Sequence, residues 1–151
     1  PTEIRKEIEV NLFGMYNVLF PLAKRMKARN SEGYIVIVSS LMAKLAAPLW
    51  STYGATKAAQ LNFAKALRAE LQPYGVHVAV LMPPSVETEM TKNIKKHSLA
   101  ISCEMEKVTK ALVQGILQNK KEIVVNYQST VVLFLYKFFP GVIDYLIRIF
   151  S

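Results

Sequence analysis

Two short runs of mainly apolar residues constrain the fold of this chain more than any other feature of its sequence. They are YIVIV at 34–38 and VHVAVLM at 76–82. The turn signal NSEG precedes the first run, and two consecutive prolines end the second. Strands that are apolar on both faces are typical of a parallel sheet covered by helices on both sides. The two runs therefore predict buried parallel strands.

Helical patterns alternate with these strands. Residues 2–29 predict one helix whose buried face is formed by apolar residues at intervals of three and four, namely Ile4, Ile8, Leu12, Met15, Leu19 and Leu22. Residues 51–72 predict a second helix, 86–102 a loop with a short helix, and 121–126 a third strand. Residues 104–118 predict an amphipathic helix with four residues turned inward: Val108, Leu112, Ile116 and Leu117. This order predicts an α/β fold with a doubly wound parallel sheet.

Polar residues gather at one edge of the predicted sheet. Ser39 and Ser40 end the first strand, and the prolines at 83–84 end the second. Tyr53 and Lys57 begin the intervening helix, four positions apart. Ligands of parallel sheets bind beyond the carboxyl ends of the strands. The sequence therefore predicts that these residues share one site.

Three stretches of the chain resemble the second half of a short-chain dehydrogenase/reductase: IVIVSS, STYGATKAAQLNFAKALRAEL and VHVAVLMPPSVETEM. Ser40 lies 13 positions before Tyr53, the tyrosine of a Tyr-x-x-x-Lys motif, and Asn11 stands in an N-x-x-G context. The resemblance covers about residues 1–126. It implies that residues 1–127 are the second half of a Rossmann-like domain and that an apolar helical tail, 128–151, follows.

The resemblance also implies a role for each of these residues. Tyr53 would give a proton to the ketone oxygen, and Lys57 would lower the pKa of the phenol and hold the nicotinamide ribose. Ser40 would hydrogen-bond the substrate oxygen, with Ser39 as the alternative. Asn11 would link the lysine to bulk water through a proton relay. The hydride would come from the cofactor.

Cofactor contacts are expected from Pro83, Val86 and Thr88 in addition to Tyr53 and Lys57. NADPH is favoured over NADH as a property of the family. The family usually has Pro-Gly after this strand, whereas this chain has Pro-Pro, as in reductases of 3-ketosphinganine. None of the six glycines forms the Gly-rich turn that receives a pyrophosphate. The chain by itself is therefore expected to bind cofactor poorly, to be inactive and to leave a sheet edge uncovered.

The tail from 128 to 151 contains two apolar runs separated by FPG. These runs are too interrupted to predict a membrane-spanning helix, which needs about 20 predominantly apolar residues. An interfacial hairpin or monotopic anchor is favoured, because basic residues precede the tail and the net charge is +8. The alternatives are a helix that covers the substrate pocket and a dimer contact. Nucleic-acid binding is not expected, since no aromatic-interleaved basic groove occurs.

The single cysteine, Cys103, gives no disulfide framework and no metal site, which favours a reducing compartment. The sequence therefore predicts a membrane-associated NAD(P)H-dependent reductase of a lipidic ketone, placed at the endoplasmic reticulum, with a homodimer formed through the long helices. 3-Ketosphinganine is the favoured substrate, and steroid, retinoid and 3-ketoacyl substrates remain open. The alternative is a truncated, non-catalytic, membrane-bound interaction module.

Overall fold

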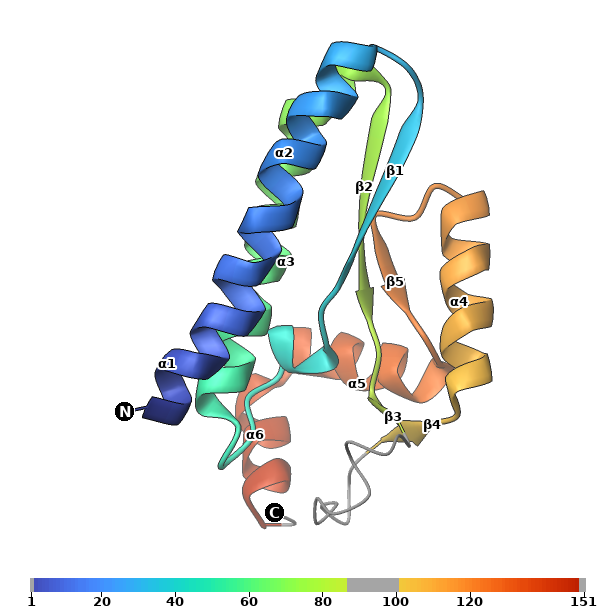
Figure 1. Cartoon of the computed structure of the whole chain (residues 1–151). Coiled ribbons are helices and arrows are strands. Elements are labelled where there is room, and N and C mark those ends of the chain that lie inside the picture. The colour runs from blue at the N-terminus through green and yellow to red at the C-terminus, as the bar shows by residue number, and fades with distance from the viewer. Residues whose placement is uncertain (1, 87–100, 150–151) are drawn as a thin grey trace.

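A three-stranded parallel sheet forms the centre of the computed structural model, which describes residues 2–86 and 101–149 (Figure 1). Its strands are β1 (Gly33–Val38), β2 (Val76–Met82) and β5 (Glu122–Val124), in the order β1-β2-β5. Ile35 pairs with Val78, and Leu81 with Ile123. The three strands expected from the sequence are thereby confirmed. A second, two-stranded parallel sheet joins β3 (Ser85–Val86) to β4 (Ser102–Cys103).

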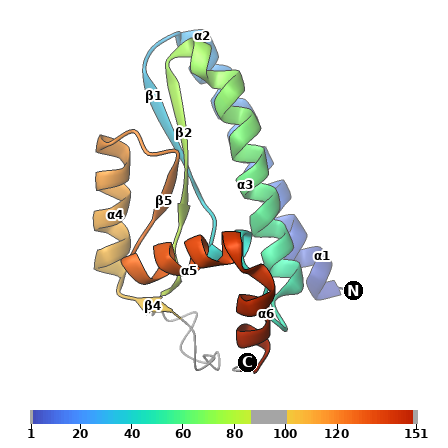
Figure 2. The same cartoon turned by 180° about the vertical axis from the view of Figure 1, so that it is seen from behind.

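Helices cover both faces of the larger sheet (Figures 1 and 2). On one face, α1 (Thr2–Ile8), a π-helical segment (Glu9–Phe13) and α2 (Gly14–Arg29) run beside α3 (Ser51–Leu71). On the other face lies α4 (Met105–Leu117). Short 3₁₀ helices follow β1 (Leu41–Ala43) and α3 (Gln72–Tyr74). This layered arrangement is the Rossmann-like fold that the sequence predicts.

Each face of the sheet has its own hydrophobic core. The core on the α2–α3 side contains Leu19, Ala23, Ile35, Ile37, Leu41, Leu61, Ala64, Leu67, Leu71, Val76, Val78, Val80 and Met82. The core on the α4 side contains Ala79, Leu81, Cys103, Val108 and Ile123. Residues of β2 alternate between the two cores. This double burial explains why the sequence of β2 is apolar almost throughout.

The first helix departs from the predicted pattern. Ile4 and Leu22 are exposed, whereas Leu19 and Ala23 are buried. A π-helical segment at Glu9–Phe13 interrupts this helix, and its hydrogen bonds close one residue further along the chain than those of an α turn. Beyond the segment, Met15 and Leu19 keep their predicted places against the core, and the next buried residue is Ala23, four positions after Leu19, instead of Leu22.

In α4, the predicted inward position of Leu117 is wrong, since its side chain is 78% exposed. Val108 is buried, Leu112 packs against the same core as predicted, and Gly115 is the next fully buried residue. A Cβ atom at Gly115 would lie 2.4 Å from Cδ1 of Ile123. The absent side chain therefore lets α4 approach β5 closely, and the helix turns Leu117 away from the sheet.

The strand β1 lies at an edge of the three-stranded sheet. Within residues 2–86 and 101–149, its only bonded strand is β2, and Val38 is 57% exposed. A groove of about 290 Å³ runs between β1 and the π-helical segment. The uncovered edge that the sequence predicts is therefore present.

The tail forms two helices, α5 (Tyr127–Phe138) and α6 (Pro140–Ile149), near the carboxyl ends of the strands (Figure 1). The side chain of Asn126 caps α5 by accepting a hydrogen bond of 2.9 Å from the backbone N–H of Ser129. Among the described residues, no helix has the length and apolar character that crossing a membrane requires. The loop and short helix predicted for 86–102 fall mostly outside the described residues.

Candidate active site

Two adjacent buried serines follow β1 and have different partners. The Ser39 hydroxyl donates to the backbone carbonyl of Lys57 at 3.0 Å, which attaches the strand end to α3. The Ser40 Oγ accepts a hydrogen bond from the backbone N–H of Met42 at 3.2 Å and caps the following 3₁₀ helix. Ser40 also forms a side-chain hydrogen bond with Tyr53. Of the two candidates, Ser40 is therefore the serine in contact with the tyrosine.

Tyr53 and Lys57 lie on one face of the first turns of α3. The Lys57 Nζ is 5.5 Å from the centroid of the Tyr53 ring, a cation–π distance. The Trp50 ring packs against the Tyr53 ring edge-on, with 5.6 Å between centroids. These contacts hold the phenol between the ammonium group and an aromatic side chain.

The Lys57 ammonium group has two hydrogen-bond acceptors. One is the backbone carbonyl of Val38, the last residue of β1, at 3.3 Å. The other is Oε1 of Gln60, one helical turn further along α3, at 3.2 Å. An ammonium group has three N–H donors. The carbonyl and the amide use two of them.

Asn11 belongs to the π-helical segment and contacts α3 through both its side chain and its backbone. Its Nδ2 donates to the Thr56 hydroxyl at 3.0 Å, and that hydroxyl donates to the Tyr53 carbonyl at 2.8 Å. The backbone carbonyl of Asn11 accepts a hydrogen bond from Nε2 of Gln60 at 2.7 Å. Asn11 is thus connected to Lys57 through the side chain of Gln60.

Thr56 and Gln60 are site residues that the sequence analysis did not identify. Both are polar and buried. They lie three and seven positions after Tyr53, at spacings that share a helix face with Tyr53 and Lys57. Polar residues at core-facing positions of an otherwise apolar helix were the signal that could have found them.

Burial raises the pKa of the Tyr53 phenol above its ordinary value of 10.0, a hydrogen bond with Ser40 lowers it, and the charge of Glu7 raises it. Burial lowers the pKa of Lys57 below 10.5, and the charge of Glu7 acts in the opposite direction. The net shift of the tyrosine pKa is therefore upward, against the lowering expected from Lys57. Burial is the largest cause of this upward shift, and the Lys57 ammonium group donates its hydrogen bonds to Val38 and Gln60.

Comparison with protein families decides what kind of protein carries this arrangement. The family described as short chain dehydrogenase matches residues 1–99. The chain belongs to the short-chain dehydrogenase family. The serine, the Tyr-x-x-x-Lys pair and the asparagine on which the resemblance was based all lie within the matched residues.

Individual relatives of the chain agree with the family match. The chain is 36% identical over 141 residues to a 17-beta-hydroxysteroid dehydrogenase 13 of Rattus norvegicus, covering 91% of this chain and 46% of the relative. It is 36% identical over 90 residues to a 3-dehydrosphinganine reductase of Arabidopsis thaliana, covering 58% of this chain and 27% of the relative. The chain therefore spans less than half the length of these relatives.

Solved structures support the same assignment of the fold. A short-chain dehydrogenase of Burkholderia cenocepacia, crystallised with NADP, aligns with a TM-score of 0.78 at 26% identity. The alignment covers 89% of this chain and 54% of that one.

Two of the residues expected to touch a cofactor, Pro83 and Val86, lie near the carboxyl edge of the sheet. The Pro83 carbonyl accepts a hydrogen bond of 3.1 Å from the backbone N–H of Leu41, the neighbour of Ser40. Val86 lies in β3 and pairs with Cys103. Thr88 falls outside the described residues. The Pro83 segment is therefore held beside the serine at the carboxyl edge of the sheet.

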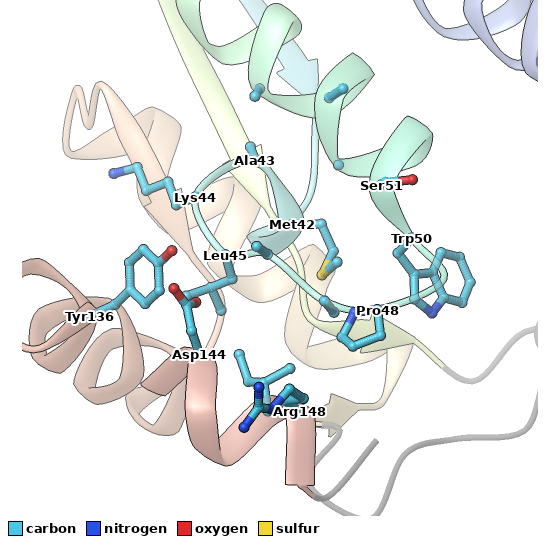
Figure 3. A pocket seen from close by; sticks show the side chains of 16 residues that line it. Met42, Ala43, Lys44, Leu45, Pro48, Trp50, Ser51, Tyr136, Asp144 and Arg148 are labelled. Carbon is cyan, nitrogen blue, oxygen red and sulfur yellow. The ribbon is translucent and has the colours of Figure 1, made fainter. Parts of the chain in front are cut away.

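A cavity of about 490 Å³ lies between the loop after β1, the start of α3 and the tail (Figure 3). Its walls include Met42, Pro48 and Trp50, and neither Ser40 nor Tyr53 lines it. The tail contributes Tyr136, Asp144, Ile147 and Arg148. Burial raises the pKa of Tyr136, as do the charge of Asp144 and the hydrogen bond that its carboxylate accepts from the phenol. The tail therefore packs on the loop that follows the candidate catalytic serine.

Proposed function

We propose that these residues are the catalytic part of a nicotinamide-dependent reductase that acts on a lipidic ketone. One observation carries this proposal: Ser40, Tyr53 and Lys57 meet at the carboxyl edge of a parallel sheet, and Asn11 joins them through a continuous set of hydrogen bonds. That edge is where α/β proteins bind their ligands.

The proposed chemistry reduces a carbonyl to a secondary alcohol. A nicotinamide cofactor, when bound, would supply the hydride that the carbonyl carbon accepts. The Tyr53 hydroxyl gives its proton to the carbonyl oxygen, so that the alcohol forms and a phenolate remains until it is reprotonated. The Ser40 hydroxyl donates a hydrogen bond to the same oxygen as negative charge develops on it. The Tyr53 phenol, whose pKa burial raises above 10.0, carries its proton at neutral pH before the transfer.

The lysine suits both the phenolate and a cofactor ribose. Its positive charge beside the Tyr53 ring stabilises the phenolate that forms during the reaction. With two of its three donors occupied by Val38 and Gln60, one N–H is available for a ribose hydroxyl. We assign NADPH as the preferred cofactor. The short-chain dehydrogenase of Burkholderia cenocepacia, whose structure contains NADP, supports this choice.

The proposed substrate is 3-ketosphinganine. Two observations support it: the Pro83–Pro84 pair after β2 and the match to a plant 3-dehydrosphinganine reductase. The match to a 17-beta-hydroxysteroid dehydrogenase extends over more of the chain and supports a steroid ketone as the second candidate. Both candidates are hydrophobic ketones.

We also propose that the protein works at a membrane surface of the endoplasmic reticulum. The net charge of +8 favours attraction to anionic headgroups. Several large apolar side chains of α5 and α6 are exposed, namely Phe134, Phe138, Phe139, Val142, Leu146 and Ile149. An interfacial position would let a lipidic ketone reach the site from the bilayer.

The deciding experiment uses the natural protein at its full length. Purified protein is given NADPH or NADH with 3-ketosphinganine, a 17-ketosteroid or a 3-ketoacyl thioester, and oxidation of the cofactor is followed by absorbance. Preferred turnover of 3-ketosphinganine with NADPH is expected. Faster turnover of the steroid would replace the substrate assignment and leave the reductase assignment intact. No turnover of any ketone, with cofactor bound, would favour the non-catalytic module.

A further inference from the structure

Gln60 is a buried amide whose two ends bind different elements of the candidate site. Its side chain is on α3, and the residue is only 5% exposed. Its Oε1 accepts from the Lys57 ammonium group at 3.2 Å, and its Nε2 donates to the Asn11 carbonyl at 2.7 Å. A buried amide needs such partners on both sides, because a polar atom that loses its hydrogen bonds to water in a protein interior destabilises the fold unless it is paired again.

Both partners fix the same orientation of the amide. A backbone carbonyl only accepts hydrogen bonds, and an ammonium group only donates them. Nε2 must therefore point to Asn11, and Oε1 must point to Lys57. Turning the amide by 180° would place its donors against the ammonium group and its oxygen against a carbonyl, so a single arrangement is stable.

The acceptor in this arrangement lies in an unusual part of the backbone. Asn11 is the middle residue of the π-helical segment Glu9–Phe13, which interrupts the long first helix. Single π turns are rare and occur frequently at functional sites. Gln60 thus connects the lysine to the one π-helical turn within the part of the chain that the structure describes.

We propose that Gln60 is a positioning residue that orients the Lys57 ammonium group by bridging it to the backbone of Asn11. This inference rests on the proposed function, because Lys57 is assigned there to the phenolate and the cofactor. With one donor held by Gln60 and another by the Val38 carbonyl, the ammonium group has a fixed position and its third N–H would be the one offered to a cofactor. It is a direct hydrogen-bonded link between Lys57 and Asn11, at the point where the sequence predicts a proton relay.

Two titratable side chains lie near Lys57. Glu7 of α1 acts on the ammonium group through its negative charge, and the centroid of the Tyr53 ring in α3 is 5.5 Å from the Lys57 Nζ. From β1, Val38 contributes only a neutral carbonyl. The Gln60 oxygen is therefore the side-chain acceptor that hydrogen-bonds the ammonium group in the described part of the chain. Hydrogen bonding to a charged form favours that form, so Gln60 supports the positive charge of Lys57 against burial.

Two substitutions test the bridge in the full-length natural protein. Gln60→Met keeps the volume and removes both hydrogen bonds, whereas Gln60→Glu keeps an acceptor for Lys57 and adds a negative charge. The pKa of Lys57 is measured by NMR titration of isotopically labelled lysine, without cofactor or ketone. We expect Gln60→Met to lower the pKa of Lys57 and Gln60→Glu to raise it. Gln114→Leu, at an exposed glutamine of α4, should leave it unchanged.

Opposite shifts of the Lys57 pKa in the two variants would support the bridge, because a merely structural role of Gln60 would not produce them. Shifts in the same direction, or no shift in either variant, would overturn the proposal. In kinetic assays, Gln60→Met should lower kcat about tenfold with little change in the KM of the ketone, the size expected for one hydrogen bond to a charged group. If the wild-type protein reduces no ketone, the proposed function fails, and the NMR titration still decides whether Gln60 orients Lys57.

Discussion

The side-chain amide of Asn11 donates a hydrogen bond of 3.0 Å to the hydroxyl of Thr56, a residue 45 positions away in the chain. The same hydroxyl donates to the Tyr53 carbonyl at 2.8 Å. One threonine therefore connects the π-helical segment to the helical turn that carries the proposed proton donor.

Thr56→Val is expected to destabilise the protein and to slow catalysis moderately. Valine has nearly the shape of threonine, but it leaves the Asn11 amide without its acceptor, which costs about 1–3 kcal/mol of unfolding free energy. Urea unfolding measures this loss. The matched control is Thr109→Val, an exposed helical threonine whose hydroxyl donates to the Met105 carbonyl. Equal effects of the two substitutions would show that the Asn11 contact contributes nothing beyond an ordinary helix contact.

Tyr53→Phe is expected to abolish most ketone reduction in the full-length protein while leaving it folded. The substitution removes only the hydroxyl that gives the proton, and general acid–base catalysis contributes roughly 10²–10⁴-fold to a rate. Single-turnover oxidation of NADPH measures the change, and Tyr127→Phe at an exposed position serves as the control. Turnover within about twofold of wild type would remove Tyr53 from the mechanism.

The shifted pKa values of Tyr53 and Lys57 predict opposite effects of alkaline pH on stability. Because the folded pKa of Tyr53 lies above 10.0, the unfolded chain loses the phenolic proton first. The stability that this shift contributes is therefore present below pH 10.0 and is lost as the pH rises through the folded pKa. Because the folded pKa of Lys57 lies below 10.5, its contribution is complete above pH 10.5 and is lost as the pH falls through the folded pKa.

Urea unfolding as a function of pH tests both signs. As the pH rises above 10.0, the wild type should lose stability relative to Tyr53→Phe. As the pH rises toward 10.5, it should gain stability relative to Lys57→Met. Parallel curves for wild type and Tyr53→Phe would contradict the raised pKa of the phenol.

The sequence was sufficient to predict the strands, the edge at which they end and the shared face of Tyr53 and Lys57, because each of these follows from a local pattern. The burial of Ala23 in place of Leu22 could not be predicted from a 3.6-residue period, because positions three and four residues after Leu19 fit that period equally well. The contacts that Asn11 makes from the π turn depend on α3, which is distant in the sequence. The bridge made by Gln60 depends likewise on a partner 49 positions away. Interactions of this kind form only after the helices have packed.

Gly115→Ala is expected to destabilise the protein, because α4 and β5 are too close for a side chain there. The added Cβ would lie 2.4 Å from Cδ1 of Ile123, which is itself buried. Overpacking of a core costs about 1–3 kcal/mol, more than the gain in helix propensity from replacing glycine. Gly141→Ala, where a Cβ would meet nothing within 4 Å, is the control. A midpoint of thermal unfolding that Gly115→Ala leaves unchanged would contradict the close packing.

Removing two aromatic rings from the tail is expected to weaken binding to membranes. Phe134 and Phe138 are 62% and 56% exposed, and their ring centroids are 5.0 Å apart, so both can enter a lipid interface together. The double substitution Phe134→Ser with Phe138→Ser should reduce co-sedimentation of the full-length protein with phosphatidylserine vesicles at least tenfold, since each buried ring contributes about 1.5–3 kcal/mol. Phe20→Ser, at an exposed phenylalanine of α2, should retain binding. Equal binding of all three proteins would exclude the tail as the membrane contact.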